Sequence, residues 1–91
     1  MYAKKIVIKN DICLNFEEVV FLVKKSNEFE SRIWFEVEEK KINAKSLLGT
    51  LILKFPNKSE LTVLSNGKDE KTATNTLVKY IKFIIKYSMF R

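Results

Sequence analysis

The segment Ile42–Gly49 reads INAKSLLG and marks the point where a strand passes into a helix. Before it, apolar and polar residues alternate over 32–38, which predicts a half-buried strand. A tight turn at 38–40 would return the chain and complete a hairpin. After it, Ser46 is placed to cap a short helix of residues 47–52. The segment is therefore expected to join a hairpin to that helix.

The same alternation occurs near both ends of the chain. Isoleucines alternate with their neighbours over 5–9, which predicts a first strand, and apolar residues alternate with polar ones over 60–64, which predicts a fourth. Residues 55–58 contain the single proline and are expected to form a loop. Strands are thus expected both before and after the hairpin.

Two longer helices flank these strands. Asn15 is followed three residues later by Glu18, the pattern of a capping box, and the apolar residues after it have helical spacing. This predicts a helix over Phe16–Ser26. A second helix is expected from about Glu70 to Tyr87, with Asp69 placed to cap its first turn.

The resulting order is β-α-β-β-α-β-α, which predicts an α+β fold. An antiparallel four-stranded sheet would carry three helices on one face and expose the other face to water, an open-faced sandwich. The length of 91 residues suits a single domain spanning 1–91.

The composition argues against several kinds of site. The chain has no histidine and a single cysteine, Cys13, so a zinc site, an internal disulfide and every histidine-dependent catalytic scheme are not expected. The longest apolar run, Val19–Val23, is far too short to cross a membrane. We expect a cytoplasmic, unprocessed protein without a metal or cofactor.

The charge is basic, with a net value of +6 from 17 lysines and arginines and 11 acidic residues. Such a balance fits nucleic acid, an anionic membrane surface or an acidic protein as partner. Lys79, Lys82 and Lys86 share one face of the last helix and are the candidates for such contacts. The simpler interpretation is a solvated helix face, and we regard nucleic acid as a disfavoured partner.

Two segments together resemble motifs of the HPr family, the phosphocarrier proteins of the bacterial sugar phosphotransferase system. Ile42–Gly49 is similar to the family's regulatory segment, whose serine is the target of HPr kinase/phosphorylase in low-GC Gram-positive bacteria. Leu64–Glu70, which reads LSNGKDE, is similar to the family's S-x-G-x-D-E turn. The resemblance covers about Lys5 to Ile81 without a gap. It implies the HPr open-faced sandwich.

The resemblance fails at the active loop, where the family has G-(I/L)-H-A-R-P-A and this chain has CLNFEEV over Cys13–Val19. Asn15 occupies the phosphohistidine position, Glu17 the arginine position and Glu18 the proline position. An amide nitrogen is delocalised and cannot form a labile phosphoramidate, and carboxylates repel a phosphate dianion where arginine would bind it. The resemblance therefore implies that phosphoryl transfer is lost and that the chain has no catalytic residue.

The resemblance makes Ser46 a candidate for regulatory phosphorylation. Leu47, Leu48 and Leu51 would then supply the apolar docking surface of the family's short helix. In the family fold the start of the first helix lies near this serine, so Glu17 is expected to oppose the added charge. Ser46 and Asn15 can also be explained as helix caps alone. Cys13 is either a thiol near a helix start or a small residue filling the loop.

The function expected is that of an HPr-like protein that carries no phosphoryl group. It would be a regulatory or protein-binding module related to the sugar phosphotransferase system and carbon catabolite control, and not an enzyme. Its partners would be proteins, such as an HPr-type serine kinase or a transcription regulator. The alternative is a basic nucleic-acid or membrane-surface binding domain on the same fold, and a phosphocarrier using another residue ranks last.

Two apolar surfaces suggest self-association. Trp34 is expected on the open sheet face, with Val7 and Leu64 close by as a partner-binding patch. The last helix adds an aromatic stripe, formed by Tyr80, Phe83 and Tyr87, and is expected to extend through residues 87–91. Burial of a few such side chains would support a weak homodimer.

Overall fold

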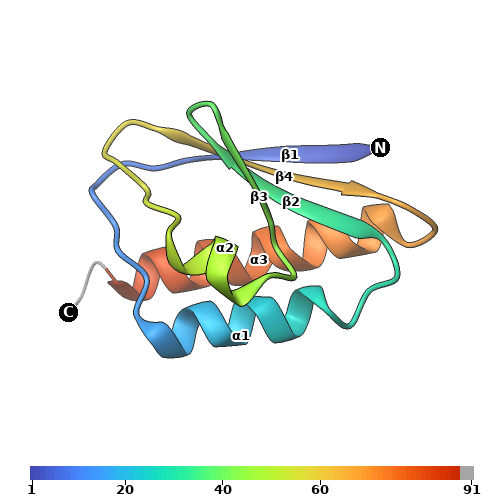
Figure 1. Ribbon diagram of the computed structural model, residues 1–91. Helices are drawn as coiled ribbons and strands as arrows, with labels where there is room; N and C mark the ends of the chain where they lie inside the picture. Colours follow the sequence, from blue (N-terminus) through green and yellow to red (C-terminus); the bar gives the residue numbers. More distant parts are fainter. Residues whose placement is uncertain (89–91) are drawn as a thin grey trace.

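The computed structural model describes residues 1–88 and contains four strands and three helices (Figure 1). In chain order these are β1 (Tyr2–Val7), α1 (Phe16–Ser26), β2 (Arg32–Val37), β3 (Lys40–Asn43), α2 (Leu47–Leu51), β4 (Glu60–Asn66) and α3 (Glu70–Ser88). The strands form one antiparallel sheet in the order β1-β4-β2-β3. The predicted α+β order is confirmed.

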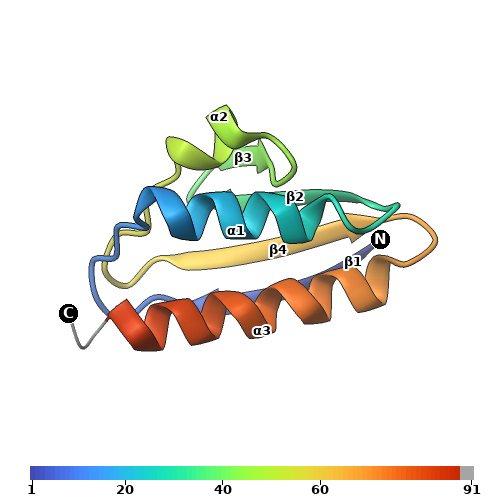
Figure 2. The same ribbon diagram turned by 90° about the horizontal axis from the view of Figure 1, so that it is seen from below.

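The three helices cover one face of the sheet (Figures 1 and 2). α1 and α3 lie side by side and run in opposite directions, so that the start of α1 and the end of α3 are at the same end of the molecule (Figure 2). The strand residues that alternate toward them are almost fully buried, namely Ile33, Phe35, Val37, Leu61 and Val63. Helix α3 packs on this layer with Leu77, Ile81 and Ile84.

Two strands are longer than the sequence pattern indicated. β1 begins at Tyr2, which pairs with Ser65, and β4 continues to Asn66, which pairs with Arg32. The first residues of β1 are largely exposed, so they lack the apolar alternation from which a strand is recognised. Backbone hydrogen bonding to β4 forms this part of the strand instead.

The carboxylate of Asp69, expected to cap α3, binds the α1–β2 loop instead. It accepts hydrogen bonds from the backbone N–H groups of Glu30 at 3.0 Å and Ser31 at 2.9 Å, and from the Ser31 hydroxyl. These bonds, that of the Ser31 hydroxyl foremost, hold the pKa of Asp69 below its ordinary value. Glu70 accepts a hydrogen bond from Gly67 N–H at 3.2 Å and contacts the Met1 amino group at 3.0 Å.

The turn before α3 requires glycine at one position. Gly67 has a φ of +154°, and a Cβ built on it would lie 2.7 Å from Ser31 Cα. The turn therefore packs directly against the loop that Asp69 holds.

No helix within residues 1–88 combines the length and apolar character needed to cross a membrane.

Candidate functional site

The loop before α1 is tied to the segment that precedes β4. Ile12 N–H donates to Phe55 O at 3.0 Å, and Asn57 N–H donates to Asp11 Oδ1 at 2.6 Å. Cys13, the residue after Ile12, is exposed, and its sulfur lies 3.9 Å from Leu14 O. These bonds set the position from which α1 starts.

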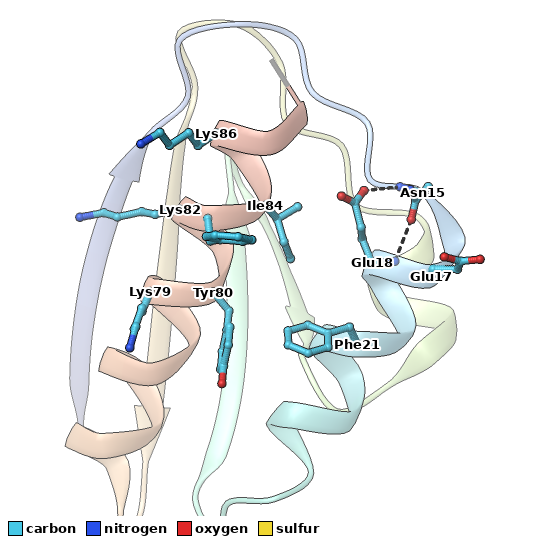
Figure 3. A pocket seen from close by; sticks show the side chains of 10 residues that line it. Asn15, Glu17, Glu18, Phe21, Lys79, Tyr80, Lys82, Ile84 and Lys86 are labelled. Carbon is cyan, nitrogen blue, oxygen red and sulfur yellow. Dashed lines mark hydrogen bonds between the residues drawn. The ribbon is translucent and has the colours of Figure 1, made fainter. Parts of the chain in front are cut away.

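Asn15 and Glu18 form the predicted capping box at the start of α1 (Figure 3). Glu18 N–H donates to Asn15 Oδ1 at 2.8 Å, and Asn15 N–H donates to Glu18 Oε1 at 2.9 Å. Both residues therefore satisfy backbone groups that the first helical turn leaves unpaired. The side chain at position 15 is used as a structural cap.

The charge of this loop is negative. Residues 13–18 contain Glu17 and Glu18 and no lysine or arginine. Glu17 is exposed and extends outward from the first turn of α1, away from α3 (Figure 3). Residues 13–18 therefore offer a phosphate dianion two carboxylates and no guanidinium fork.

Ser46 begins α2 as an N-cap, as predicted. Its Oγ accepts a hydrogen bond from Gly49 N–H at 3.2 Å, and the side chain is half-buried. Next to it, Lys45 N–H donates to Asn43 Oδ1 at 2.9 Å, and Lys45 Nζ donates to Phe29 O at 2.6 Å. The Lys45 ammonium is therefore engaged with the α1–β2 loop.

The start of α2 lies beside the end of α1. Asn27 Nδ2 donates to Lys45 O at 3.2 Å, which places the residue before Ser46 at the α1 C-terminus. Glu17 precedes Asn27 by ten residues in the sequence, or about 15 Å of helix rise. The expectation that Glu17 sits next to Ser46 is therefore corrected, because the helix carries it toward the opposite end.

The leucines of α2 are exposed, as a docking surface requires. Leu48 is 78% exposed and the neighbouring Ile52 is 70% exposed, while Leu47 and Leu51 are close to 40%. Thr50 faces inward and is buried. We call Leu47, Leu48, Leu51 and Ile52 the α2 patch.

Trp34 lies on the open sheet face opposite Leu64, but Val7 does not complete the expected patch. Trp34 is half-buried and pairs with Leu64, and the Lys41 ammonium lies 4.7 Å from its ring centroid. On β1 the residue paired with Leu64 is Ala3, whereas Val7 pairs with Glu60. Val7 is four residues further along, about 13 Å of strand. The Lys41 ammonium over Trp34, and the distance of Val7 from Leu64, therefore break up the predicted apolar patch.

An apolar groove of about 640 Å³ runs between α1 and α3. It is lined by Asn15, Glu17, Glu18, Phe21, Lys79, Tyr80, Lys82, Phe83, Ile84 and Lys86. We call it the α1–α3 groove (Figure 3). Phe21 and Tyr80 meet edge to face, with ring centroids 5.0 Å apart. Sequence reasoning identified the α3 aromatics but not Phe21, because nothing local indicates which helices become neighbours.

The expected lysine face of α3 is present, and two of its lysines lie near β1 and the residues that follow it. Lys82 and Lys86 extend toward the β1 side (Figure 3). There they line a second, smaller pocket together with Lys5 and Lys9. Lys5 also lies 3.7 Å from Glu60. The remaining residues of the helix extension, 89–91, lie outside the described part of the chain.

Comparison with known proteins gives a family and several relatives. The family model described as the PTS HPr component phosphorylation site matches residues 2–82. The HPr-like protein Crh of Halalkalibacterium halodurans is 32% identical over 82 residues, covering 90% of this chain and 98% of that protein. Crh of Bacillus subtilis is 29% identical over 82 residues, covering 90% and 96%.

The solved structures agree with this result. The crystal structure of HPr-C-His from Thermoanaerobacter tengcongensis has a TM-score of 0.80 and 31% identity, covering 94% of this chain and 97% of that one. Crystalline Crh of Bacillus subtilis, described as a catabolite repression protein with a swapped domain in a dimer, has a TM-score of 0.71 and 29% identity, with 90% and 94% covered. The similarity spans nearly the whole of each chain.

Proposed function

Since the chain belongs to the HPr family of the sugar phosphotransferase system, we propose that it is a regulatory, protein-binding member that carries no phosphoryl group. The observation that supports this most directly is the capping box of Asn15 and Glu18. It occupies the position at which the family resemblance puts the phosphohistidine.

The chemistry of the loop supports the same conclusion. Phosphoryl transfer needs a nucleophilic nitrogen with a free lone pair, and the Asn15 amide has a delocalised nitrogen and an oxygen already bonded to Glu18 N–H. Glu17 adds a negative charge where the family has an arginine, which disfavours an approaching phosphate dianion. Cys13 is a poor substitute, because residues 13–18 provide two carboxylates and no cation, and Lys54, which lines a pocket with Cys13, shares that pocket with the Asp11 carboxylate.

The role in carbon catabolite control is supported by the similarity to Crh. Two relatives bear the name HPr-like protein Crh, and the solved Crh of Bacillus subtilis is described as a catabolite repression protein. We propose that this chain has a role in catabolite control as well, and that it acts by binding a transcription regulator or an HPr-type serine kinase. The family consists of carriers and regulators, which agrees with a chain that is not an enzyme.

Ser46 is the proposed modification site. Its hydroxyl is half-buried and accepts a bond of 3.2 Å from Gly49 N–H, at the long end of the range for such bonds, and a kinase would have to displace this bond to engage it. The α2 patch beside it offers exposed leucine side chains for docking. Ser46 would therefore accept the phosphoryl group, and the adjoining α2 patch would bind the kinase.

Two phosphorylation assays test the proposal. Incubation with Enzyme I and labelled phosphoenolpyruvate should give no acid-labile label, while a true HPr in the same assay is labelled. Incubation with HPr kinase/phosphorylase and ATP should add one phosphate at Ser46, detected by mass spectrometry. Labelling by Enzyme I at the rate of a true HPr would refute the loss of the carrier function, and a Ser46 left unmodified would refute the regulatory site.

A second candidate function is binding to an anionic surface. Among residues 1–88, the lining of the pocket shared by β1 and α3 includes Lys5, Lys9, Lys82 and Lys86 and no acidic residue. Lysines grouped in this way favour phosphate-rich partners. Sedimentation with anionic and neutral vesicles, and fluorescence anisotropy with single-stranded DNA at physiological salt, test the two forms of this alternative. Binding abolished by Lys82→Glu would favour it over the regulatory role.

A further inference from the structure

We propose that the α1–α3 groove is the interface of a two-fold homodimer in which two intact copies lie face to face. The proposal goes beyond the regulatory function above and does not depend on it. It names both the surface and its occupant, a second copy of this chain. The argument rests on the exposed aromatics of the groove and on the charges along its two rims.

The groove exposes large apolar side chains. Phe83 is 63% exposed and lies in the groove, and the adjacent Tyr87 is 66% exposed. Their rings stack with centroids 5.8 Å apart, so they form one continuous apolar ridge on α3. Phe21 of α1 contributes a partly exposed ring on the facing side. Such a contiguous apolar surface marks a protein contact.

The two rims of the groove have opposite charge at the same end of the molecule. The start of α1 lies beside the end of α3, because the two helices are antiparallel (Figure 2). In Figure 3, Glu17 extends outward on the α1 side, whereas Lys82 and Lys86 extend outward on the α3 side. One rim is therefore acidic and the other basic at equal height along the groove.

This arrangement is complementary to itself under one choice of symmetry axis. A two-fold axis along the groove places α1 of one copy over α3 of the other, without a shift along the helices. Glu17 of each copy then faces Lys82 and Lys86 of the other, and the contact occurs twice. An axis across the groove would instead bring the lysine-bearing rims of the two α3 helices together. The charges thus select the axis that runs along the groove.

The sheet face is the weaker candidate for self-association. Trp34 is half-buried, lies under the Lys41 ammonium at 4.7 Å, and is separated from Val7. Lys25 lies over the Phe21 ring of the groove in the same way, at 5.7 Å, so the cation does not distinguish the two surfaces. The polar neighbours in the row adjoining Trp34, Glu36 and Thr62, reduce the apolar area of the sheet face. Trp34 therefore provides a matched control residue for the groove.

Analytical ultracentrifugation from about 5 to 500 μM covers the range expected of a weak dimer. The sedimentation coefficient should rise across this range. Glu17→Lys and Lys82→Glu should each weaken the dimer about tenfold, because an attraction becomes a repulsion at two symmetric places. The double variant Glu17→Lys/Lys82→Glu restores the attraction between positions 17 and 82 but leaves Lys86 facing a lysine, so it should dimerise more tightly than Glu17→Lys and more weakly than the original chain. Circular dichroism verifies that each variant remains folded.

Mixing the two single variants gives the sharpest test. Each disfavours its own dimer, but a heterodimer gains one fully complementary side, so the mixture should sediment faster than either variant alone. Phe83→Ser should abolish the dimer, and Trp34→Ser should leave it unchanged. A single monomeric species throughout, or a dimer lost in Trp34→Ser and kept in the charge variants, would overturn the proposal. So would a dimer that persists for hours after dilution, because that behaviour indicates exchanged segments.

Discussion

Asn15 and Glu18 hold each other at the start of α1, each accepting a hydrogen bond from the other's backbone N–H, at 2.8 and 2.9 Å. At the position where the family resemblance puts a phosphorylated histidine, this chain therefore has a residue engaged in helix capping. A substitution at position 15 should therefore change the free energy of unfolding of the protein.

Asn15→Ala should lower the free energy of unfolding by about 1 kcal/mol, because it removes the Oδ1 acceptor of the Glu18 N–H bond, whereas the bond from the backbone N–H of residue 15 to Glu18 does not use this side chain. Asn15→Ser, which retains an acceptor oxygen, should lose only a fraction of that. Urea denaturation monitored by Trp34 fluorescence measures both. Equal stabilities of the alanine and serine variants would mean that the box contributes nothing in solution.

Leu48→Ser should impair modification of Ser46 while leaving the fold intact. Leu48 is 78% exposed, so its replacement should change stability by less than about 0.5 kcal/mol. If the kinase buries this side chain, kcat/KM should fall about tenfold, in line with the free energy of burying a leucine. Steady-state assays with HPr kinase/phosphorylase measure the effect. Val7→Ser, which replaces another largely exposed apolar side chain on the sheet, is the control and should leave kcat/KM unchanged.

Asp69 should make the stability of the protein depend on acid pH. The Ser31 hydroxyl and the Glu30 amide hold its pKa below the ordinary 3.8, so its charged form is favoured in the folded state. That contribution is complete above about pH 3.8 and is lost as pH falls through the lowered value. Asp69→Asn should lower the melting temperature at neutral pH and flatten its decline below pH 3.8.

Glu70, whose pKa is also lowered by the Gly67 N–H, should leave a residual acid dependence in that variant. Melting curves of the wild type and of Asp69→Asn between neutral and acid pH test this. Parallel curves for the two proteins would show that the Asp69 carboxylate is not the group responsible.

The two glycines should respond to alanine in opposite directions. Gly67→Ala should destabilise the protein by about 1–3 kcal/mol, because the residue has a positive φ and a Cβ would collide with Ser31. At Gly49 the nearest atoms to a built Cβ lie 3.5 Å away, which is ordinary contact. Gly49→Ala should therefore be neutral or stabilise by up to about 1 kcal/mol. Thermal and urea unfolding of both variants decide the matter.

The sequence by itself determined the features that depend on near neighbours. The bounds of α1 agree with the prediction because the capping box lies within four residues and the apolar spacing within a few turns. The strand cores, the hairpin and the Ser46 cap follow from equally short patterns. The motifs at Ile42–Gly49 and Leu64–Glu70 then indicated the family, which the comparisons confirm.

Only the tertiary structure decided the contacts between distant segments. Asp69 bonds to Ser31 across 38 residues, and no periodic pattern distinguishes that role from capping α3. The start of α2 lies beside Asn27, not Glu17, because the direction in which α2 crosses α1 depends on packing. The α1–α3 groove likewise joins Phe21 to Tyr80. Local sequence patterns predict each helix separately. Which side chains of two helices come into contact depends on how both helices bury their apolar faces on the sheet.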